Sequence, residues 1–394
     1  MIVTAPRLEV TDARSTLHAR FEFDDGDREP FEAWMAVPSD YADSVDRSAT
    51  PFVPIATQVA GHIGEDLRFE APASPRLVAA ATTASQLFGE WWGYRPVRIE
   101  APVPSTLAEA GAGVGIFYSR GTDTGATLVR SLTGAIPERV THLLSGFDIE
   151  WAFATEVQHQ IWAGHEAVAN ELGLPLVRLE SNAKELLRGL IGWPRAFGTA
   201  YISPALMLGP LLGQIVTGST QPVIGAEPRG SRYDLDPLWS TEGTCVRQDA
   251  YELDRLRRIG IVATHPLILR SLKVCWMGRE AGNCGRCGKC LRTMTALAWH
   301  RVDPEDWPTF DGVLTGEAVL ATKTEPGAAS QLAWTAGLPT ELADVRDAWE
   351  VKRRQTAELD AAAAQERERA ARRRARRRRR RRLMRKVRRR LGSA

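Results

Sequence analysis

The amino-acid sequence predicts an α/β protein whose central part is a doubly wound parallel sheet. Between about residue 110 and residue 300, short apolar runs alternate with longer segments of helical periodicity. This rhythm is typical of a parallel sheet with helices on both faces. The flanks differ from this centre: the first hundred residues have the pattern of a small α+β unit, and residues 371–394 hold 15 basic and no acidic residues.

The same shifts in pattern divide the 394 residues into three predicted domains. We expect an N-terminal α+β domain at residues 1–105, a central domain at 106–345, and a helical linker with a basic tail at 346–394. The tail is predicted to be either disordered or helical, because like charges at i,i+4 repel and such a segment buries no apolar surface of its own.

In the N-terminal part, alternating apolar residues predict two strands, and an acidic turn with a glycine between them predicts a hairpin. The strands are expected at residues 17–23 and 31–37. A helix is expected at 79–92, ending near Gly93, followed by a short strand at 97–99. No residues with recognisable chemistry stand out in this part.

Strands and helices alternate through the central part. The predicted strands are 114–118, 142–147, 176–179 and 215–217, and the predicted helices are 123–132, 152–172 and 200–212. Sheets of this kind bind ligands beyond the carboxyl ends of their strands, so the residues that follow each strand are the candidate site residues. Asn182 and Ser219 follow the third and fourth strands; the alternative is that each only bonds nearby backbone groups.

The charge balance excludes a protein that is basic throughout. The chain holds 51 Lys and Arg against 48 Asp and Glu, a net charge of +3, yet residues 1–370 alone have a net charge of −12. No apolar run is long enough to span a membrane, so we expect no transmembrane segment. The N-terminal residues also lack the charged and apolar regions of a signal peptide. We therefore expect a cytoplasmic protein.

A loop of small residues joins the first central strand to its helix. It reads Ser119-Arg120-Gly121-Thr122-Asp123-Thr124. Such loops direct backbone N–H groups at an anion near the helix N-terminus. The hydroxyls of Ser119 and Thr124 can bond phosphate oxygens, and Asp123 can cap the helix or hold Mg²⁺. An ordinary Ser/Asp helix cap is the alternative interpretation.

Four of the five cysteines are grouped in the spacing C-x8-C-x2-C-x2-C. They are Cys275, Cys284, Cys287 and Cys290. Two-residue gaps let thiolates converge on one ion, and a site closed by four cysteines is structural, so we predict structural zinc. An iron–sulfur cluster is the alternative, although ferredoxin-like runs place a fourth cysteine downstream and before a proline. The fifth cysteine, Cys245, is expected to be a buried thiol.

Other polar residues in the central part carry weaker expectations. Asp234 and Trp239 are interpreted as an Asp-Pro turn with the tryptophan in the core, although two carboxylates beside a tryptophan would also suit a flat polar ligand. His165 is expected to be a surface or packing residue. His265 is expected to begin a strand from which it can reach the site.

The loop resembles the S-G-G-x-D-S/T signature of the PP-loop ATP pyrophosphatases, the adenine nucleotide α-hydrolase group, whose sheet is of the HUP type. The matching residues are Ser119, Gly121, Asp123 and Thr124. Arg120 departs from the signature by replacing its first glycine. With the cysteine spacing, residues 110–300 resemble the 7-cyano-7-deazaguanine synthases, and resemble more closely a set of relatives that carry an additional N-terminal domain.

The resemblance implies an ATP-dependent enzyme of the ligase or synthase type. ATP would lie over residues 119–124 with Mg²⁺, and a substrate carboxylate or carbonyl oxygen would attack its α-phosphate. Pyrophosphate leaves, and ammonia or another nucleophile then displaces AMP to give an amide or nitrile. Asp123 and Thr124 would be catalytic, and Asp148, after the second strand, would contact adenosine or the metal. Arg120 would either obstruct the nucleotide or donate to a phosphate.

Two other functions stay open on the sequence. An enzyme of the same fold can modify RNA, as in tRNA thiolation, and the basic tail at 372–390 would suit nucleic acid or another polyanion as a partner. A non-catalytic descendant can bind nucleotide through an altered loop, and the departure at Arg120 keeps this reading open. The sequence gives neither the substrate nor the oligomeric state.

Overall fold

The computed structural model describes residues 1–149, 155–277, 282–324 and 330–391. The chain forms two compact units, one of residues 1–284 with 296–311 and the other of residues 285–295 with 312–394. Among the described residues, the helices are all too short or too polar to cross a membrane.

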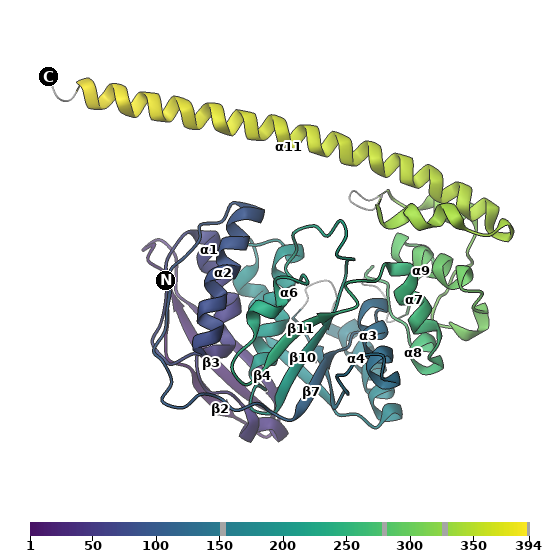
Figure 1. Ribbon diagram of the computed structural model, residues 1–394, viewed down its shortest axis with the longest axis horizontal. Coiled ribbons are helices and arrows are strands. Elements are labelled where there is room, and N and C mark those ends of the chain that lie inside the picture. The colour runs from purple at the N-terminus through teal and green to yellow at the C-terminus, as the bar shows by residue number, and fades with distance from the viewer. Residues whose placement is uncertain (150–154, 278–281, 325–329, 392–394) are drawn as a thin grey trace. The chain divides into compact units, whose positions relative to one another are not determined.

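The first unit is built on one mixed sheet of strand order β11-β10-β7-β8-β9-β4-β3-β1-β5-β6, in which β2 pairs with β3 (Figure 1). Its central strands are parallel to one another. They are β7 (Gly113–Phe117), β8 (His142–Gly146), β9 (Leu176–Ser181), β10 (Leu212–Gly218) and β11 (Cys245–Asp249). The predicted α/β class with a largely parallel sheet is therefore confirmed. The strand order reverses between β7 and β10, as it does in doubly wound sheets.

Helices connect these parallel strands, and two more follow the last strand. The connecting helices are α3 (Thr122–Thr133), α4 (Thr155–Leu172), α5 (Ala183–Leu187) and α6 (Trp193–Leu206), whereas α7 (Arg255–Ala263) and α8 (Pro266–Arg270) follow β11. Helix α3 packs on β7 and β10, whereas α6 packs on β9 and β4. Because crossovers between parallel strands are right-handed, the connections on the two sides of the reversal lie on opposite faces of the sheet.

Two expectations about secondary structure in the central part are wrong. The helix expected at 200–212 ends at Leu206, and Leu212 already begins β10. Gly213 lies within β10, where an added Cβ would come 2.1 Å from the Gly111 carbonyl oxygen. His265 does not begin a strand, because it is the N-cap residue of α8. The first residues of the helix expected at 152–172 lie outside the described residues.

The N-terminal hairpin and helix are present as expected. Strands β3 (Arg14–Glu22) and β4 (Phe31–Pro38) pair antiparallel, and α2 (Pro75–Trp92) ends at Gly93, whose φ is +73°. The last strand is shifted to β6 (Ile99–Glu100). Three strands and one α-helix were not expected from the pattern. They are β1 (Ile2–Val3), β2 (Arg7–Val10), β5 (Leu67–Phe69) and α1 (Val53–Ile63).

The N-terminal strands continue the parallel sheet through an antiparallel pair of β4 and β9. Asn182, directly after β9, fixes this junction with its side-chain amide. Its Oδ1 accepts from the Trp34 N–H at 2.8 Å, and its Nδ2 donates to the Glu32 carbonyl at 2.8 Å. The hydrophobic core contains residues from both sides of this junction. The domain boundaries expected at 105/106 and 345/346 stay predictions.

The second unit is organised around α11 (Ala343–Leu391), which packs against α10 (Gly316–Ala321) and the 3-10 segment Ser330–Gly337. Trp349 is buried and its Nε1 donates to Thr295 Oγ1 at 2.9 Å. One turn further, Lys352 Nζ donates to the Thr322 carbonyl at 2.6 Å. The backbone of α11 is helical through the basic segment as far as Leu391.

Replacing Asn182 with alanine should destabilise the sheet junction. Two backbone groups, the Trp34 N–H and the Glu32 carbonyl, would lose their partners at the start of β4. We expect the free energy of unfolding to fall by about 1–3 kcal/mol, measured by urea denaturation. Asn182→Asp keeps the acceptor and should cost less. Equal stability of Asn182→Ala and the unchanged chain would contradict this role.

Candidate nucleotide loop and metal centre

The crevice at the strand reversal is formed by the carboxyl ends of β7 and β10. The chain leaves β7, turns through Ser119 and Arg120, and enters α3 at Thr122. On the other side, β10 ends at Gly218, where an added Cβ would lie 2.8 Å from the Asp123 carbonyl oxygen. The missing side chain thus lets β10 approach the first turn of α3. Doubly wound sheets bind their ligands in this crevice.

The N-terminus of α3 has no side-chain cap, because its N-cap residue is Gly121. The ordinary Ser/Asp helix cap, our alternative interpretation of the loop, is therefore not formed. Instead Ser119 Oγ and Thr124 Oγ1 lie 3.1 Å apart, and the Ser119 N–H donates to Thr124 Oγ1 at 3.2 Å. Two adjacent hydroxyls beside an uncapped helix N-terminus suit an anion such as phosphate.

Arg120 has a left-handed backbone and a buried side chain. Its φ is +57°, a conformation that glycine adopts without strain. Its side chain is directed at Ser271, whose carbonyl accepts from Nε at 2.9 Å. It also passes Gly164 of α4, where an added Cβ would come 1.3 Å from the guanidinium. Burial lowers the pKa of Arg120. The two roles expected for Arg120, obstructing the nucleotide or donating to a phosphate, stay predictions.

Asp123 forms ion pairs with two arginines of α7. Its Oδ1 lies 2.8 Å from Arg258 and its Oδ2 lies 3.5 Å from Arg255. Arg258 is buried and also donates to the carbonyls of Ser219 and Leu253. The arginines compete with a cation for the carboxylate oxygens, so this pairing weakens Asp123 as an Mg²⁺ ligand. These arginines were not predicted from the sequence, in which Asp254, the acidic N-cap directly before Arg255, was the available signal of the helix.

Asp148, after β8, is hydrogen-bonded to Gln158 and Lys184. Its Oδ1 accepts from Gln158 Nε2 at 3.0 Å and from Lys184, and its N–H donates to Gln158 Oε1 at 2.7 Å. Burial alone would raise the pKa of Asp148, but the hydrogen bonds from Lys184 and Gln158 outweigh burial and lower it. The carboxylate is therefore ionised at neutral pH, and its side chain keeps an exposed fraction of 47%.

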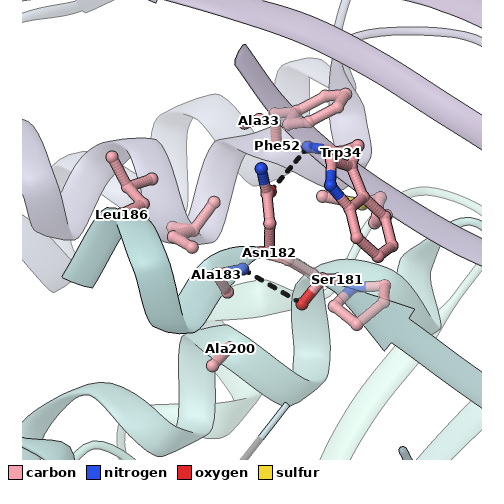
Figure 2. Close-up of a pocket in the computed structure, with 12 residues that line it drawn as sticks. Ala33, Trp34, Phe52, Ser181, Asn182, Ala183, Leu186 and Ala200 are labelled. Carbon is pink, nitrogen blue, oxygen red and sulfur yellow. Dashed lines mark hydrogen bonds between the residues drawn. The ribbon is translucent and has the colours of Figure 1, made fainter. Parts of the chain in front are cut away.

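Asn182 and Ser219 fit the alternative of loop residues that bond backbone groups. Figure 2 shows the Asn182 amide turned toward Trp34 on β4, at the edge of a small apolar pocket. The pocket has a free volume of about 10 Å³, close to what one water molecule needs and far below a nucleotide. Ser219 Oγ donates to the Gln221 carbonyl at 2.6 Å, and its N–H donates to the Asp249 carbonyl at 2.9 Å.

The Asp-Pro turn after β10 is a buried hydrogen-bonded network, with Trp239 fully buried as expected. Asp236 accepts from Thr217 and Ser231 at 2.7 Å each, and from Gln248 at 3.3 Å. Burial raises the pKa of Asp236 to about 6, despite these hydrogen bonds. The network attaches the turn to β10 and β11. The sequence did not predict this role for Asp236.

His165 packs in the core, in agreement with its expected packing role. It is 4% exposed, and its Nδ1 lies 3.0 Å from Ser145 Oγ. Burial and the nearby Arg120 lower the pKa of His165 to about 3, so the ring is neutral. Asp234 is held in an ion pair with Arg232 at 3.0 Å.

The four grouped cysteines are brought together as predicted. The sulfur atoms of Cys275 and Cys284 are 3.5 Å apart, and those of Cys287 and Cys290 are 3.4 Å apart. All four sulfurs lie within 4.8 Å of one another. Zinc with sulfur ligands at about 2.3 Å requires tetrahedral sulfur separations of about 3.8 Å. The group can therefore hold a metal ion such as zinc.

Hydrogen bonds outside the sulfurs fix the loop that carries the first ligand. Asn283 Oδ1 accepts from the N–H groups of Val274 at 2.7 Å and Cys275 at 3.0 Å. The buried Lys273 donates to the Cys275 carbonyl at 2.8 Å, so a positive charge lies beside the ligand loop. Such partners orient metal ligands and offset thiolate charge. Gly285, with φ +63°, turns the chain directly after Cys284.

Cys245 is exposed rather than buried, which corrects our expectation. It is the first residue of β11, the strand at the edge of the sheet. It does not belong to the cysteine group and provides a natural control for it.

Comparisons of the chain with models of protein families, with curated proteins and with solved structures found no match. The family resemblance of the loop and the cysteines therefore stays a prediction.

Replacing Cys287 with serine should abolish metal binding, because three thiolates leave a four-coordinate site open. Metal analysis of the purified full-length chain should find about one zinc per chain before the substitution and almost none after it. Cys245→Ser is the matched control and should keep the zinc. Iron with inorganic sulfide in the unchanged chain would reject the zinc assignment.

Proposed function

We propose that the crevice between β7 and β10 binds ATP and that the protein is an ATP-dependent adenylate-forming enzyme of the ligase or synthase type. One observation carries this proposal: the uncapped N-terminus of α3 and the paired hydroxyls of Ser119 and Thr124 lie where the strand order reverses. A triphosphate supplies the anion that such a helix N-terminus favours.

Backbone and side-chain groups of the loop would both bind the phosphates. The backbone N–H groups of Gly121, Thr122 and Asp123 would donate to the pyrophosphate portion of ATP, and the two hydroxyls would donate beside them. Positive charge from the α3 dipole would stabilise the leaving pyrophosphate. Mg²⁺, when bound, neutralises phosphate charge; Asp123 and Asp148 are the candidate carboxylates, although both already have basic partners.

The proposed reaction is a displacement at the α-phosphate. A carboxylate or carbonyl oxygen of the substrate forms a bond to this phosphorus, and the bond to the β-phosphate oxygen breaks. The products are an adenylate and pyrophosphate, and ammonia or another nucleophile then displaces AMP. The enzyme's physical contribution is to hold the reactants in line and to stabilise the charge.

The cysteine group is proposed to hold structural zinc. Four thiolates close the coordination sphere, so no position is left for a reacting water molecule. Free thiolates that bind metal persist in a reducing compartment, which supports a cytoplasmic location.

Two specific observations support the alternative functions. The basic segment 372–390 has 15 positive charges in 19 residues, which favours a nucleic-acid partner and so an RNA-modifying enzyme. At about 1.5 Å per helical residue this is one charge per about 1.9 Å, close to the one phosphate per about 1.7 Å of a duplex. The arginine in the signature and the pairing of Asp123 favour a non-catalytic nucleotide-binding protein.

The unchanged protein should release pyrophosphate from ATP in the presence of Mg²⁺ and an acid substrate. Ser119→Ala should lower the rate by about tenfold or more, because a hydrogen bond to a charged phosphate is lost. Arg120→Gly should raise it, because glycine adopts the left-handed backbone without strain and opens the loop. A coupled pyrophosphate assay and ATP calorimetry measure both effects.

Thr133→Val is the matched control, since it removes an exposed hydroxyl at the other end of α3. ATP binding without pyrophosphate release in every variant would support the non-catalytic alternative. Absence of ATP binding from both the unchanged chain and Arg120→Gly would overturn the proposal for the crevice.

The basic segment should bind duplex nucleic acid with an affinity that falls steeply with salt. Each phosphate contact contributes about −0.9 to the slope of log K against log salt, so several contacts give a slope of several units. Fluorescence anisotropy over a salt series measures the slope. Removal of residues 371–394 should abolish it; unchanged binding by the shortened chain would contradict a role for this segment.

A further inference from the structure

A row of aromatic rings with one arginine runs along the first unit from the end of α2 to the residues after β11. We name it the aromatic track. Its members in order are Tyr94, Trp92, Trp91, Arg232, Tyr233 and Tyr251.

Each member of the aromatic track contacts the next. The ring centroids of Trp92 lie 5.4 Å from Tyr94 and 5.7 Å from Trp91. The Arg232 guanidinium lies 4.8 Å from the centroid of Trp91 and 5.2 Å from that of Tyr233. Tyr233 and Tyr251 follow at 5.8 Å, with their planes inclined by 30°. The track is therefore continuous.

The track leads from the core to the surface: Tyr94, its first member, is buried in the core, and the rings that follow it are more exposed. Phe88, which stacks on Trp92 at 5.1 Å, is fully buried, as is Trp239 beside it. By contrast Trp91 and Trp92 are half-buried, and Tyr251 is 40% exposed. Large aromatic rings that keep such exposure leave surface for contact with a ligand.

Two arginines, Arg195 and Arg232, lie against the aromatic rings. Arg195 is exposed and its guanidinium lies 5.6 Å from the Trp92 centroid. Among the described residues it forms no ion pair with an acidic side chain, whereas Arg232 pairs with Asp234. Interleaved aromatic faces and arginines are the surface on which unpaired nucleobases stack, while the cations accompany the phosphates.

One end of the track lies at the same sheet edge as the crevice. Tyr251 follows β11 by two residues, and its carbonyl accepts from the Val223 N–H, beyond β10, at 2.7 Å. Neighbouring strands are about 4.8 Å apart, so β11 and β7, with β10 between them, are about 10 Å apart. A strand of nucleic acid on the track would thus extend toward the residues that follow β7.

We propose that the aromatic track binds the unpaired bases of a single-stranded nucleic acid. Stacking is the recognition chemistry, because every base offers a flat face to Tyr, Trp or an arginine plane. The occupant is a polyanion rather than a neutral aromatic ligand because Arg195 carries a charge that its surroundings do not neutralise, and because the chain ends in a dense basic segment. This surface is distinct from the ATP loop and does not require nucleotide there.

The test compares single-stranded and duplex oligonucleotides of one sequence on the full-length chain, by fluorescence anisotropy without ATP. High salt screens the basic segment, so stacking then dominates binding. Tyr251→Ser should weaken single-strand binding by at least about fivefold and leave duplex binding unchanged. Tyr251→Phe should bind like the unchanged chain. Leu107→Ser, which alters an exposed apolar side chain outside the track, is the control for surface polarity.

Ribose and deoxyribose oligonucleotides distinguish RNA from DNA as the source of the bases. Ultraviolet crosslinking of the unchanged chain, read by mass spectrometry, should place adducts on track residues and needs no variant to fold. Equal single-strand affinity of Tyr251→Ser and the unchanged chain, with crosslinks confined to residues 371–394, would overturn the proposal. Because no ATP is present, that result would leave the crevice proposal intact.

Discussion

The close approach of β10 to β7 and to the first turn of α3 is the constraint on which the site depends. Glycines along β7 and β10 permit this close approach. Gly213 faces the Gly111 carbonyl, Gly115 lies between leucine side chains of its neighbours, and Gly218 lies against Asp123. A Cβ at any of these positions would come within 3 Å of another atom. Without this contact, the reversal of strand order would not form a crevice beside the loop.

The charged groups around the crevice are mostly positive, whereas the net charge of residues 1–370 is negative. Residues 1–370 carry a net charge of −12, yet the loop after β7 is surrounded by Arg120, Arg255 and Arg258. Two of these arginines neutralise Asp123, and the third is bonded to a carbonyl. The positive field at the α3 N-terminus therefore comes from the helix dipole and from cations that are already positioned, which costs little reorganisation when an anion binds.

The chain combines pieces with different chemistry. The crevice suits a phosphate, the cysteine group can hold a metal such as zinc, and the aromatic track and basic tail both suit a polyanion. If all are used together, the acceptor in the proposed adenylation is a base in a nucleic acid rather than a free acid, which joins the leading function to its RNA-modifying alternative. The crevice and the Tyr251 end of the track lie at the same sheet edge, which is consistent with this combination.

The sequence by itself determined the features that depend on local spacing. The hairpin of β3 and β4, the strands β7 to β10, the loop of residues 119–124 and the cysteine group all follow from patterns within about 20 residues. Tertiary structure decided what depends on distant segments. Strand β11 is too polar to be recognised, because Gln248 and Asp249 are buried only through partners from other elements. The cysteines could be predicted because their ligand geometry is set by short gaps.

The site residues show the same division. Sequence motifs identified Ser119, in the loop before α3, and Thr124, in its first turn, whose hydroxyls lie 3.1 Å apart. They did not show that Asn182 joins β4 to β9, that Arg258 neutralises Asp123, or that Arg120 is turned to Ser271. Those contacts connect residues that are 148, 135 and 151 positions apart in the chain, respectively. Only folding brings such groups together, so their roles belong to the tertiary structure and not to any local pattern.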